Sequence, residues 1–104
     1  MGQFRIKIKP WWVSDDYAVF KYSTNGWFWR QVRTCEYDIL SERYYMKPLI
    51  VYYSNAECRL EQFKTLGDVV EYECGERAKM GRLNADVDRE LGEVKKSKKR
   101  VYGN

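Results

Sequence analysis

The residues best equipped for catalysis are two adjacent carboxylates, Asp15 and Asp16. The chain contains no histidine, so Ser-His-Asp and Cys-His catalysis and histidine-ligated metals are excluded. Two carboxylates could act as general acid and base, but adjacent side chains in a strand or turn point in different directions. Two aspartates before an apolar segment are more typical of a turn. We therefore expect no catalytic residues, no cofactor and no small-molecule substrate, and hence not an enzyme.

Three cysteines, Cys35, Cys58 and Cys74, are the remaining reactive side chains. They are odd in number, widely spaced and without a Cys-x-x-Cys pair. Disulfide scaffolds usually have even counts, and zinc sites have short paired spacings. The pattern predicts reduced, mostly buried thiols and no metal site.

Aromatic and basic side chains gather around Asn25-Gly26, the strongest hairpin signal of the chain. Sheets that bind single-stranded nucleic acid stack bases on flat rings and attract phosphates with Lys and Arg. Our candidate nucleic-acid-binding residues here are Lys21, Trp27, Trp29, Arg30 and Arg33, with Trp11, Trp12, Arg5, Lys7 and Lys9 nearby in sequence. The alternative is that most of these aromatic side chains form the core.

The C-terminal end is a second candidate contact. Residues 1–53 carry a net charge of +3 and residues 54–94 one of −4, whereas residues 95–104 carry +5. Such asymmetry suggests a polyanionic partner, since clustered cations attract phosphates in a salt-dependent way. The alternative is a solvated tail without a partner. The cations of this basic tail are Lys95, Lys96, Lys98, Lys99 and Arg100.

Length and composition limit the architecture. The 104 residues suffice for one domain with a modest core, and fourteen of the seventeen aromatic residues lie within residues 1–53. The sequence has no apolar run near eighteen residues and no apolar N-terminal stretch, so we expect neither a membrane span nor a secretory signal, and a cytoplasmic location.

Alternation and turn residues predict the strands. Phe4, Ile6 and Ile8 alternate with charged residues, which is typical of a half-buried strand that Pro10 ends or places at an edge. Ser14-Asp15-Asp16 is expected to form a turn. Further strands are predicted over 17–22 and 27–34, with Tyr22 opposite Trp29 for a two-residue loop or opposite Trp27 for a four-residue loop. The run 49–53 is apolar on both faces and predicts a central strand; residues 36–40 could be strand or loop.

The C-terminal half has helical patterns. Residues 57–63 fit a short helix, with a capping box from Ser54 to Glu57, or a further strand; Thr65 and Asp68 form a second capping box. Beyond it we expect a packing seam against the sheet or another subunit, in a helix that is either continuous or split at Gly81. The apolar residues of this seam are Leu66, Val70, Cys74, Ala78, Met80, Leu83, Val87, Leu91 and Val94.

The segments 4–12, 20–29 and 63–73 give the chain a family likeness. Their strings FRIKIKPWW, FKYSTNGWFW and FKTLGDVVEYE resemble small proteins of tailed bacteriophages, particularly the crAss-like phages of gut Bacteroidota. The resemblance covers about half of the chain. It implies a viral accessory or virion protein that works in the bacterial host cytoplasm or in the particle, and it supplies no catalytic residues.

These patterns predict an α+β fold: a small, mostly antiparallel sheet followed by one long or two shorter C-terminal helices. Residues 1–94 form one domain, with the sheet over about 3–53 and the helical region over about 65–94, and residues 95–104 form the basic tail. We expect a non-enzymatic binding protein that contacts nucleic acid through this tail and the hairpin face. The alternative is a capsid-decorating or host-protein-interaction subunit, with a protein partner or a second copy of itself.

Overall fold

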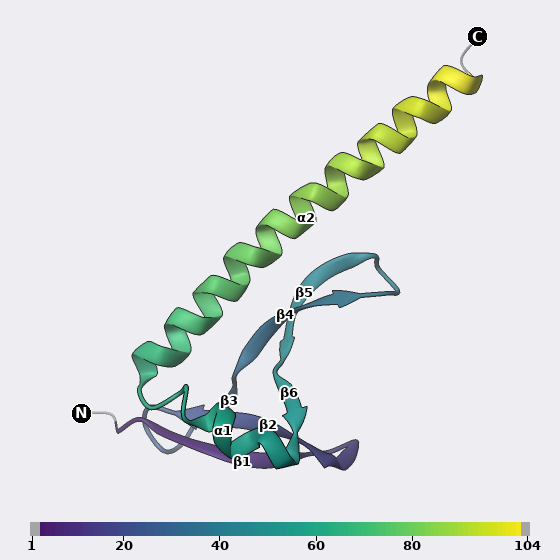
Figure 1. The fold of residues 1–104 in the computed structure, drawn as a ribbon. Coiled ribbons are helices and arrows are strands. Elements are labelled where there is room, and N and C mark those ends of the chain that lie inside the picture. The colour runs from purple at the N-terminus through teal and green to yellow at the C-terminus, as the bar shows by residue number, and fades with distance from the viewer. Residues whose placement is uncertain (1–2, 103–104) are drawn as a thin grey trace.

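A computed structural model describes residues 3–102, and the side chains of residues 3–92. Antiparallel strands fill the N-terminal half, and one long helix, α2 (Leu66–Tyr102), forms the C-terminal part (Figure 1). The predicted α+β class is therefore confirmed. Because α2 continues well past the strands, the molecule is elongated, with extents of 65 × 32 × 23 Å. No helix in the described part of the chain has the length and apolar character needed to cross a membrane.

The main sheet is arranged around β2 (Ser14–Ser23), which pairs antiparallel with β1 (Arg5–Trp11), β3 (Arg30–Gln31) and β6 (Ile50–Tyr52). Two predictions are wrong here. The expected turn at Ser14-Asp15-Asp16 is the start of β2, because the chain already reverses at Trp12 and Val13. The expected central strand over 49–53 is short and pairs with β2 alone among the described strands.

Strand β1 has the predicted alternation. Phe4, Ile6 and Ile8 are half-buried and pack against the core, while the three cations that alternate with them, Arg5, Lys7 and Lys9, are exposed. Ile6 pairs with Tyr22 and Ile8 with Phe20. The strand lies at the edge of the sheet, where Pro10 removes no inner ladder bond, and its register shifts at that residue.

The predicted pairing across the Asn25-Gly26 hairpin is wrong in both versions. Tyr22 lies opposite Arg30, and Lys21 lies opposite Gln31. The loop is longer than expected because the Ser23 and Asn25 side chains, and not a tight two-residue turn, accept hydrogen bonds from its backbone N–H groups. The predicted strand over 27–34 is correspondingly divided between β3 and the start of the next strand.

A second, two-stranded sheet follows, made of β4 (Arg33–Asp38) and β5 (Arg43–Pro48). It curves away from the main sheet and lies alongside the middle of α2 (Figure 1). The strand alternative for residues 36–40 is thus correct as far as Asp38. The turn contains Glu42 at φ 58°, a left-handed conformation, and exposes Ile39 and Leu40.

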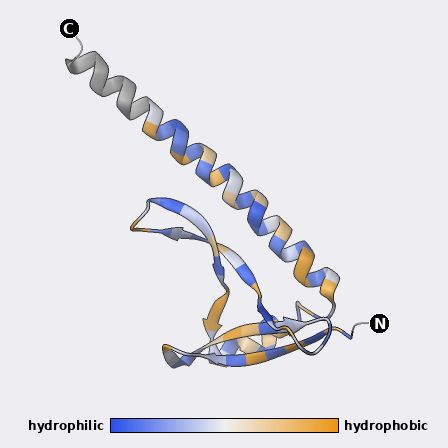
Figure 2. Cartoon of the chain, turned by 180° about the vertical axis from the view of Figure 1, so that it is seen from behind, coloured by the Kyte–Doolittle hydropathy of each residue, from blue (hydrophilic) through white to orange (hydrophobic). Residues whose placement is uncertain are grey.

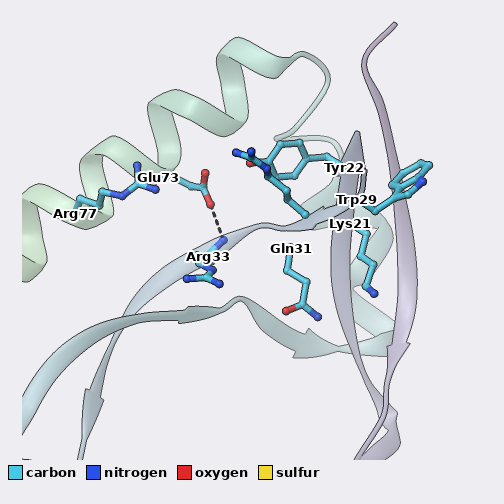
Figure 3. Close-up of a pocket in the computed structure, with 8 residues that line it drawn as sticks. Lys21, Tyr22, Trp29, Gln31, Arg33, Glu73 and Arg77 are labelled. Atoms are coloured by element: carbon cyan, nitrogen blue, oxygen red, sulfur yellow. Dashed lines mark hydrogen bonds between the residues drawn. The ribbon is translucent and has the colours of Figure 1, made fainter. Parts of the chain in front are cut away.

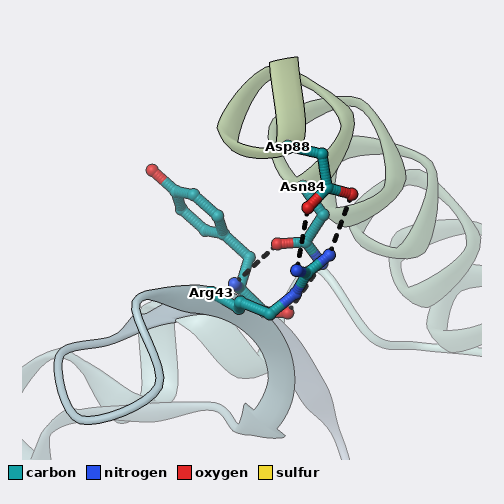
Figure 4. A network of polar contacts seen from close by, with 4 residues as sticks. Arg43, Asn84 and Asp88 are labelled. Carbon is teal, nitrogen blue, oxygen red and sulfur yellow. Dashed lines mark hydrogen bonds and ion pairs between the residues drawn. The ribbon is translucent and has the colours of Figure 1, made fainter. Parts of the chain in front are cut away.

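Polar contacts join this second hairpin to α2 at two levels. Near β4, the Glu76 carboxylate accepts hydrogen bonds from the Thr34 hydroxyl at 2.5 Å and the Cys35 N–H at 3.3 Å. Near β5, the Asn84 amide accepts from the Tyr44 N–H at 2.8 Å and donates to the Tyr44 carbonyl at 3.0 Å (Figure 4). The strand backbone is therefore positioned by side chains from the helix.

The two helices differ in how they begin. The short α1 (Ala56–Leu60) has no side-chain cap bond, so the predicted box from Ser54 to Glu57 does not form. At the start of α2 the Thr65 hydroxyl accepts from the Asp68 N–H at 3.2 Å, and the Asp68 carboxylate accepts from the Thr65 N–H at 3.0 Å. This capping box is the predicted one. The helix then passes Gly81 without a break.

The apolar seam of α2 is only partly a packing surface. Met80, Leu83 and Val87 are half-buried. In contrast, the four-residue repeat is exposed, which corrects the prediction; its members are Leu66, Val70, Cys74 and Ala78. Figure 2 shows hydrophobic residues at separate points along the helix rather than in one covered stripe. Val94 lies beyond the described side chains.

The core lies where β2, α1 and the start of α2 meet. Phe20 and Phe63 are fully buried with their ring centroids 5.7 Å apart, and Tyr72 packs edge-on against Phe63. Cys35 is buried, but Cys58 and Cys74 are exposed, so the prediction of mostly buried thiols is wrong for two of the three. All three are free thiols in the structure.

Candidate nucleic-acid interface

The main candidate site is a cavity of about 570 Å³ at the edge of β3. Residues from β2, from the β3 segment, from β4 and from α2 line this basic pocket: Lys21, Tyr22, Trp29, Arg30, Gln31, Arg33, Glu73 and Arg77. Four of the eight are cations and one is an acid. Figure 3 shows Glu73 and Arg77 on α2 opposite the strand that carries Arg33.

The single carboxylate of the pocket, that of Glu73, is hydrogen-bonded to the backbone of β4. Glu73 is only 6% exposed and accepts a hydrogen bond from the Arg33 N–H at 2.9 Å. Because one of its oxygens is used by the backbone, Glu73 serves mainly to fix β4 against α2. The remaining charge of the lining is positive, and the Arg30 and Arg33 side chains are exposed to solvent.

The strand register divides the lining between two faces of the sheet. Tyr22 and Arg30 are register partners, and so are Lys21 and Gln31. Alternation places these pairs on opposite faces. Figure 3 accordingly shows Tyr22 on the side of the strands nearer to α2 and Gln31 on the other side. The pocket therefore extends around the end of β3, and a long flexible ligand could contact both faces.

The Tyr22 phenol is half-buried beside Glu73 and Arg30. Desolvation, followed by the negative charge of Glu73, raises the pKa of this phenol above its ordinary value of 10. A neutral phenol next to Arg30 remains a hydrogen-bond donor to an anionic ligand over the whole physiological range.

The structure separates the two tryptophans that the sequence placed together. Trp29 lines the pocket, is half-buried, and has the Lys7 ammonium 3.9 Å from its ring centroid. This cation–π contact covers one face of the ring. Trp27 is 85% exposed and lies outside the pocket lining. The structure thus brings together Lys21, Trp29, Arg30 and Arg33, and leaves Trp27 apart from them.

Sequence reasoning missed Tyr22, Gln31, Glu73 and Arg77. The last two are four residues apart, so the helix presents them on one face. The sequence shows this spacing. It does not show that this face of α2 lies against the edge of β3, because that contact depends on the direction in which α2 leaves the main sheet.

The loop between β2 and β3 is fixed by two polar side chains. The buried Ser23 hydroxyl accepts from the Gly26 N–H at 2.8 Å. The Asn25 carbonyl oxygen accepts from the N–H groups of Trp27 at 2.8 Å and Phe28 at 3.0 Å. Gly26 has φ 78°, as its place in the turn requires. These bonds hold the loop backbone at Trp27 and Phe28, whose rings are exposed, whereas the third ring of the loop, Trp29, is half-buried.

A second depression, of about 470 Å³, contains Asp15 and Asp16 beside Tyr17, Tyr52 and Tyr53. The rings of Tyr17 and Tyr52 are stacked with centroids 5.0 Å apart. Within residues 3–92 no three acidic, cysteine or histidine side chains come close enough to hold a metal ion.

The cations of the basic tail, Lys95 to Arg100, lie outside the described side chains, although the helical backbone continues through them. The site as described is therefore the basic pocket and the neighbouring loop. Comparison of this chain with protein-family models, with curated proteins and with solved structures finds no match.

Proposed function

We propose that this protein binds single-stranded nucleic acid without catalysing a reaction, with the phosphates held in the basic pocket and attracted by the basic tail. The observation that carries the proposal is the pocket itself. Three strand segments that are close in sequence, and a helix that is distant from them, each contribute a cation to the lining of this pocket: Lys21, Arg30, Arg33 and Arg77. Its one carboxylate, Glu73, is buried and hydrogen-bonded.

Arginine is well suited to this role. The guanidinium group presents several N–H donors in a plane, which match the oxygens of a phosphate. Neutralising phosphates also releases counterions, which supplies most of the affinity in binding that does not depend on sequence. A pocket with three arginines and one lysine therefore favours a polyphosphate over an isolated small anion.

The exposed rings support a single strand rather than a duplex. Trp27 and Phe28 are 85% and 77% exposed on a loop adjacent to the cations. Unpaired bases can stack on such rings, whereas the bases of a duplex are already stacked on one another. The setting that we propose is that of a phage accessory or virion protein, in the bacterial host cytoplasm or in the particle.

Fluorescence anisotropy with a labelled ten-nucleotide oligothymidylate tests this function. Binding should weaken steeply with salt, with a log–log slope of about −2 to −3 from the pocket if three or four phosphates are neutralised. The double variant Arg30→Gln, Arg33→Gln should reduce both affinity and slope. Arg89→Gln is the matched control, because Arg89 pairs with Asp86 on α2 and does not line the pocket. No binding at low salt would refute the proposal.

A second function, protein–protein interaction within a virion or with a host protein, is favoured by a different observation. The β4–β5 turn presents Ile39 and Leu40 to solvent, the latter 94% exposed. Large apolar side chains at a turn are typical of contact surfaces when they lie together. If this turn is an interface, the pair of substitutions Ile39→Ser and Leu40→Ser should abolish self-association in light scattering or co-purification with a host protein. A clean monomer without partners would argue against it.

A further inference from the structure

A smaller cleft of about 380 Å³ adjoins the basic pocket and shares two of its walls, Tyr22 and Arg30. Its other side is apolar. Phe28 contributes a ring from the loop, and Leu66 and Val70 contribute side chains from the first two turns of α2. A cavity of this size is at the lower end of the range for small-molecule sites, about 300 to 1,000 Å³.

We propose that this cleft is a base-binding subsite, in which one unpaired base of the strand lies between the Phe28 ring and the Leu66–Val70 face of α2. The inference rests on the proposed function. It adds that the apolar side of the cleft binds a base, whereas the basic pocket binds phosphates. A nucleotide carries a flat apolar group next to a charged one. The two cavities match this arrangement, because the larger is lined by cations and the smaller has an apolar side. They meet at Arg30 and Tyr22.

The backbone of both walls of the cleft is held by hydrogen bonds. The backbone at Phe28 is fixed by the bond from its N–H to the Asn25 side chain at 3.0 Å. Leu66 begins a helix whose first turn is closed by the capping box of Thr65 and Asp68. Because only side chains have to be ordered on binding, the entropic cost of placing a base there is reduced.

Three apolar side chains of the cleft, Phe28, Leu66 and Val70, are each exposed although they lie around one cavity. A flat ring inserted between them would bury all three at once. Polar edges of a base would meet the polar side chains that line the same space, among them Tyr22, Thr24 and Arg30.

The test compares two strands of equal charge on the full-length protein. One is a ten-nucleotide oligothymidylate, and the other is a ten-unit abasic strand with the same phosphates. We expect the unchanged protein to bind the thymidylate strand more tightly, and Phe28→Ala to lower that affinity by about five- to one-hundredfold, the range found for base–aromatic stacking. The affinity for the abasic strand should be unaffected. Phe28→Tyr should keep the preference.

A control and a second readout separate the subsite from the fold. Trp12→Ala removes an even more exposed ring at the β1–β2 turn and should not alter the preference. The methyl NMR signals of Leu66 and Val70 should shift with the thymidylate strand but not with the abasic one. Equal affinity for both strands, or a Phe28→Ala effect of the same size on both, would overturn the subsite while leaving phosphate binding in place. Absence of binding to either strand would overturn both.

Discussion

Arg43 of β5 and Asp88 of α2 form a two-point ion pair, with Nη1–Oδ1 and Nη2–Oδ2 distances of 2.8 and 3.1 Å (Figure 4). Their side chains are 40% and 58% exposed, so solvent screens the pair and its contribution to stability is at most about 1 kcal/mol. Asn84, one turn earlier, exchanges two hydrogen bonds with the backbone of Tyr44. The ion pair and the amide contacts have different energetic weights, although they lie side by side.

Asn84→Ala should therefore destabilise the protein by about 1 to 2 kcal/mol, because it leaves the partly buried Tyr44 N–H and carbonyl without these partners. Asp88→Asn should cost less than about 1 kcal/mol. Urea denaturation measures both. Asp86→Asn is the control, since Asp86 pairs with Arg89 within the helix and makes no ion pair with β4 or β5. A larger effect of Asp88→Asn than of Asn84→Ala would contradict this ranking.

Stability should decline in acid partly through Glu76. The hydrogen bond from the Thr34 hydroxyl, assisted by the Cys35 N–H and opposed by burial, lowers the pKa of Glu76 below its ordinary value. Since the folded pKa lies below the unfolded value of about 4.3, the ionised carboxylate stabilises the fold above that pH. This stabilisation is lost as the pH falls through the lowered folded pKa.

Urea midpoints of the unchanged protein and of Glu76→Gln between pH 7 and pH 3 measure this dependence. The variant should be less stable at pH 7, and the difference should narrow toward pH 3. Glu71→Gln, at an exposed position on the same helix, should follow the unchanged protein. Parallel pH profiles for Glu76→Gln and the unchanged protein would show that the carboxylate has no such role.

Thiol chemistry should distinguish one cysteine from the other two. Cys58 and Cys74 are exposed, whereas Cys35 is buried, and burial raises the pKa of its thiol. Because the thiolate is the reactive form, a colorimetric disulfide reagent should react quickly with two thiols and with the third only after unfolding. Cys35→Ala should keep both fast equivalents. Three fast equivalents in the native protein would place Cys35 at the surface.

Two glycines should respond in opposite directions to alanine. Gly26 has φ 78°, so a side chain there costs about 1 to 2 kcal/mol although nothing lies within 4 Å of the new Cβ. Gly81 lies in the middle of α2, also with open space, and Gly81→Ala should stabilise the protein by up to about 1 kcal/mol. Thermal or urea unfolding measures both. Similar shifts of the same sign would contradict the assigned backbone conformations.

The basic tail should add salt dependence but no specificity. Replacing Lys95, Lys96, Lys98, Lys99 and Arg100 by glutamine should reduce the log–log salt slope for oligonucleotide binding by up to about 3.5, since each phosphate contact on a single strand contributes about 0.7. The preference for thymidylate over abasic strands should remain. An unchanged slope would mean that the tail makes no phosphate contacts.

Strand β1 and the start of α2 were predictable because local rules decide them. Phe4, Ile6 and Ile8 show period two, and Thr65 with Asp68 forms a capping box, each within a few residues. The hairpin at Asn25 was located but its register was wrong. The Ser23 and Asn25 side chains replace ladder bonds there, and sequence rules for tight turns do not anticipate that competition.

Long-range relationships were not predictable. Lys21, Arg30 and Arg33 were candidates from the sequence, but Arg77 joins them only because α2 passes the edge of β3. The exposed face at Val70 had the same apolar period as the half-buried face at Leu83, so periodicity could not tell them apart. Which apolar stripe is covered depends on the position of the second hairpin, and no local pattern encodes it.

The continuous α2 helix also sets a minimum length for any strand that uses both contacts. Arg77 borders the pocket, and the basic tail begins at Lys95, eighteen residues later. At about 1.5 Å per residue this separation is about 27 Å. Phosphates of a stacked strand are about 3.4 Å apart, so roughly eight nucleotides are needed to bridge it. The length of the helix thus sets a threshold: an oligonucleotide shorter than this should contact either the basic pocket or the basic tail, and should lose the contribution of the other entirely.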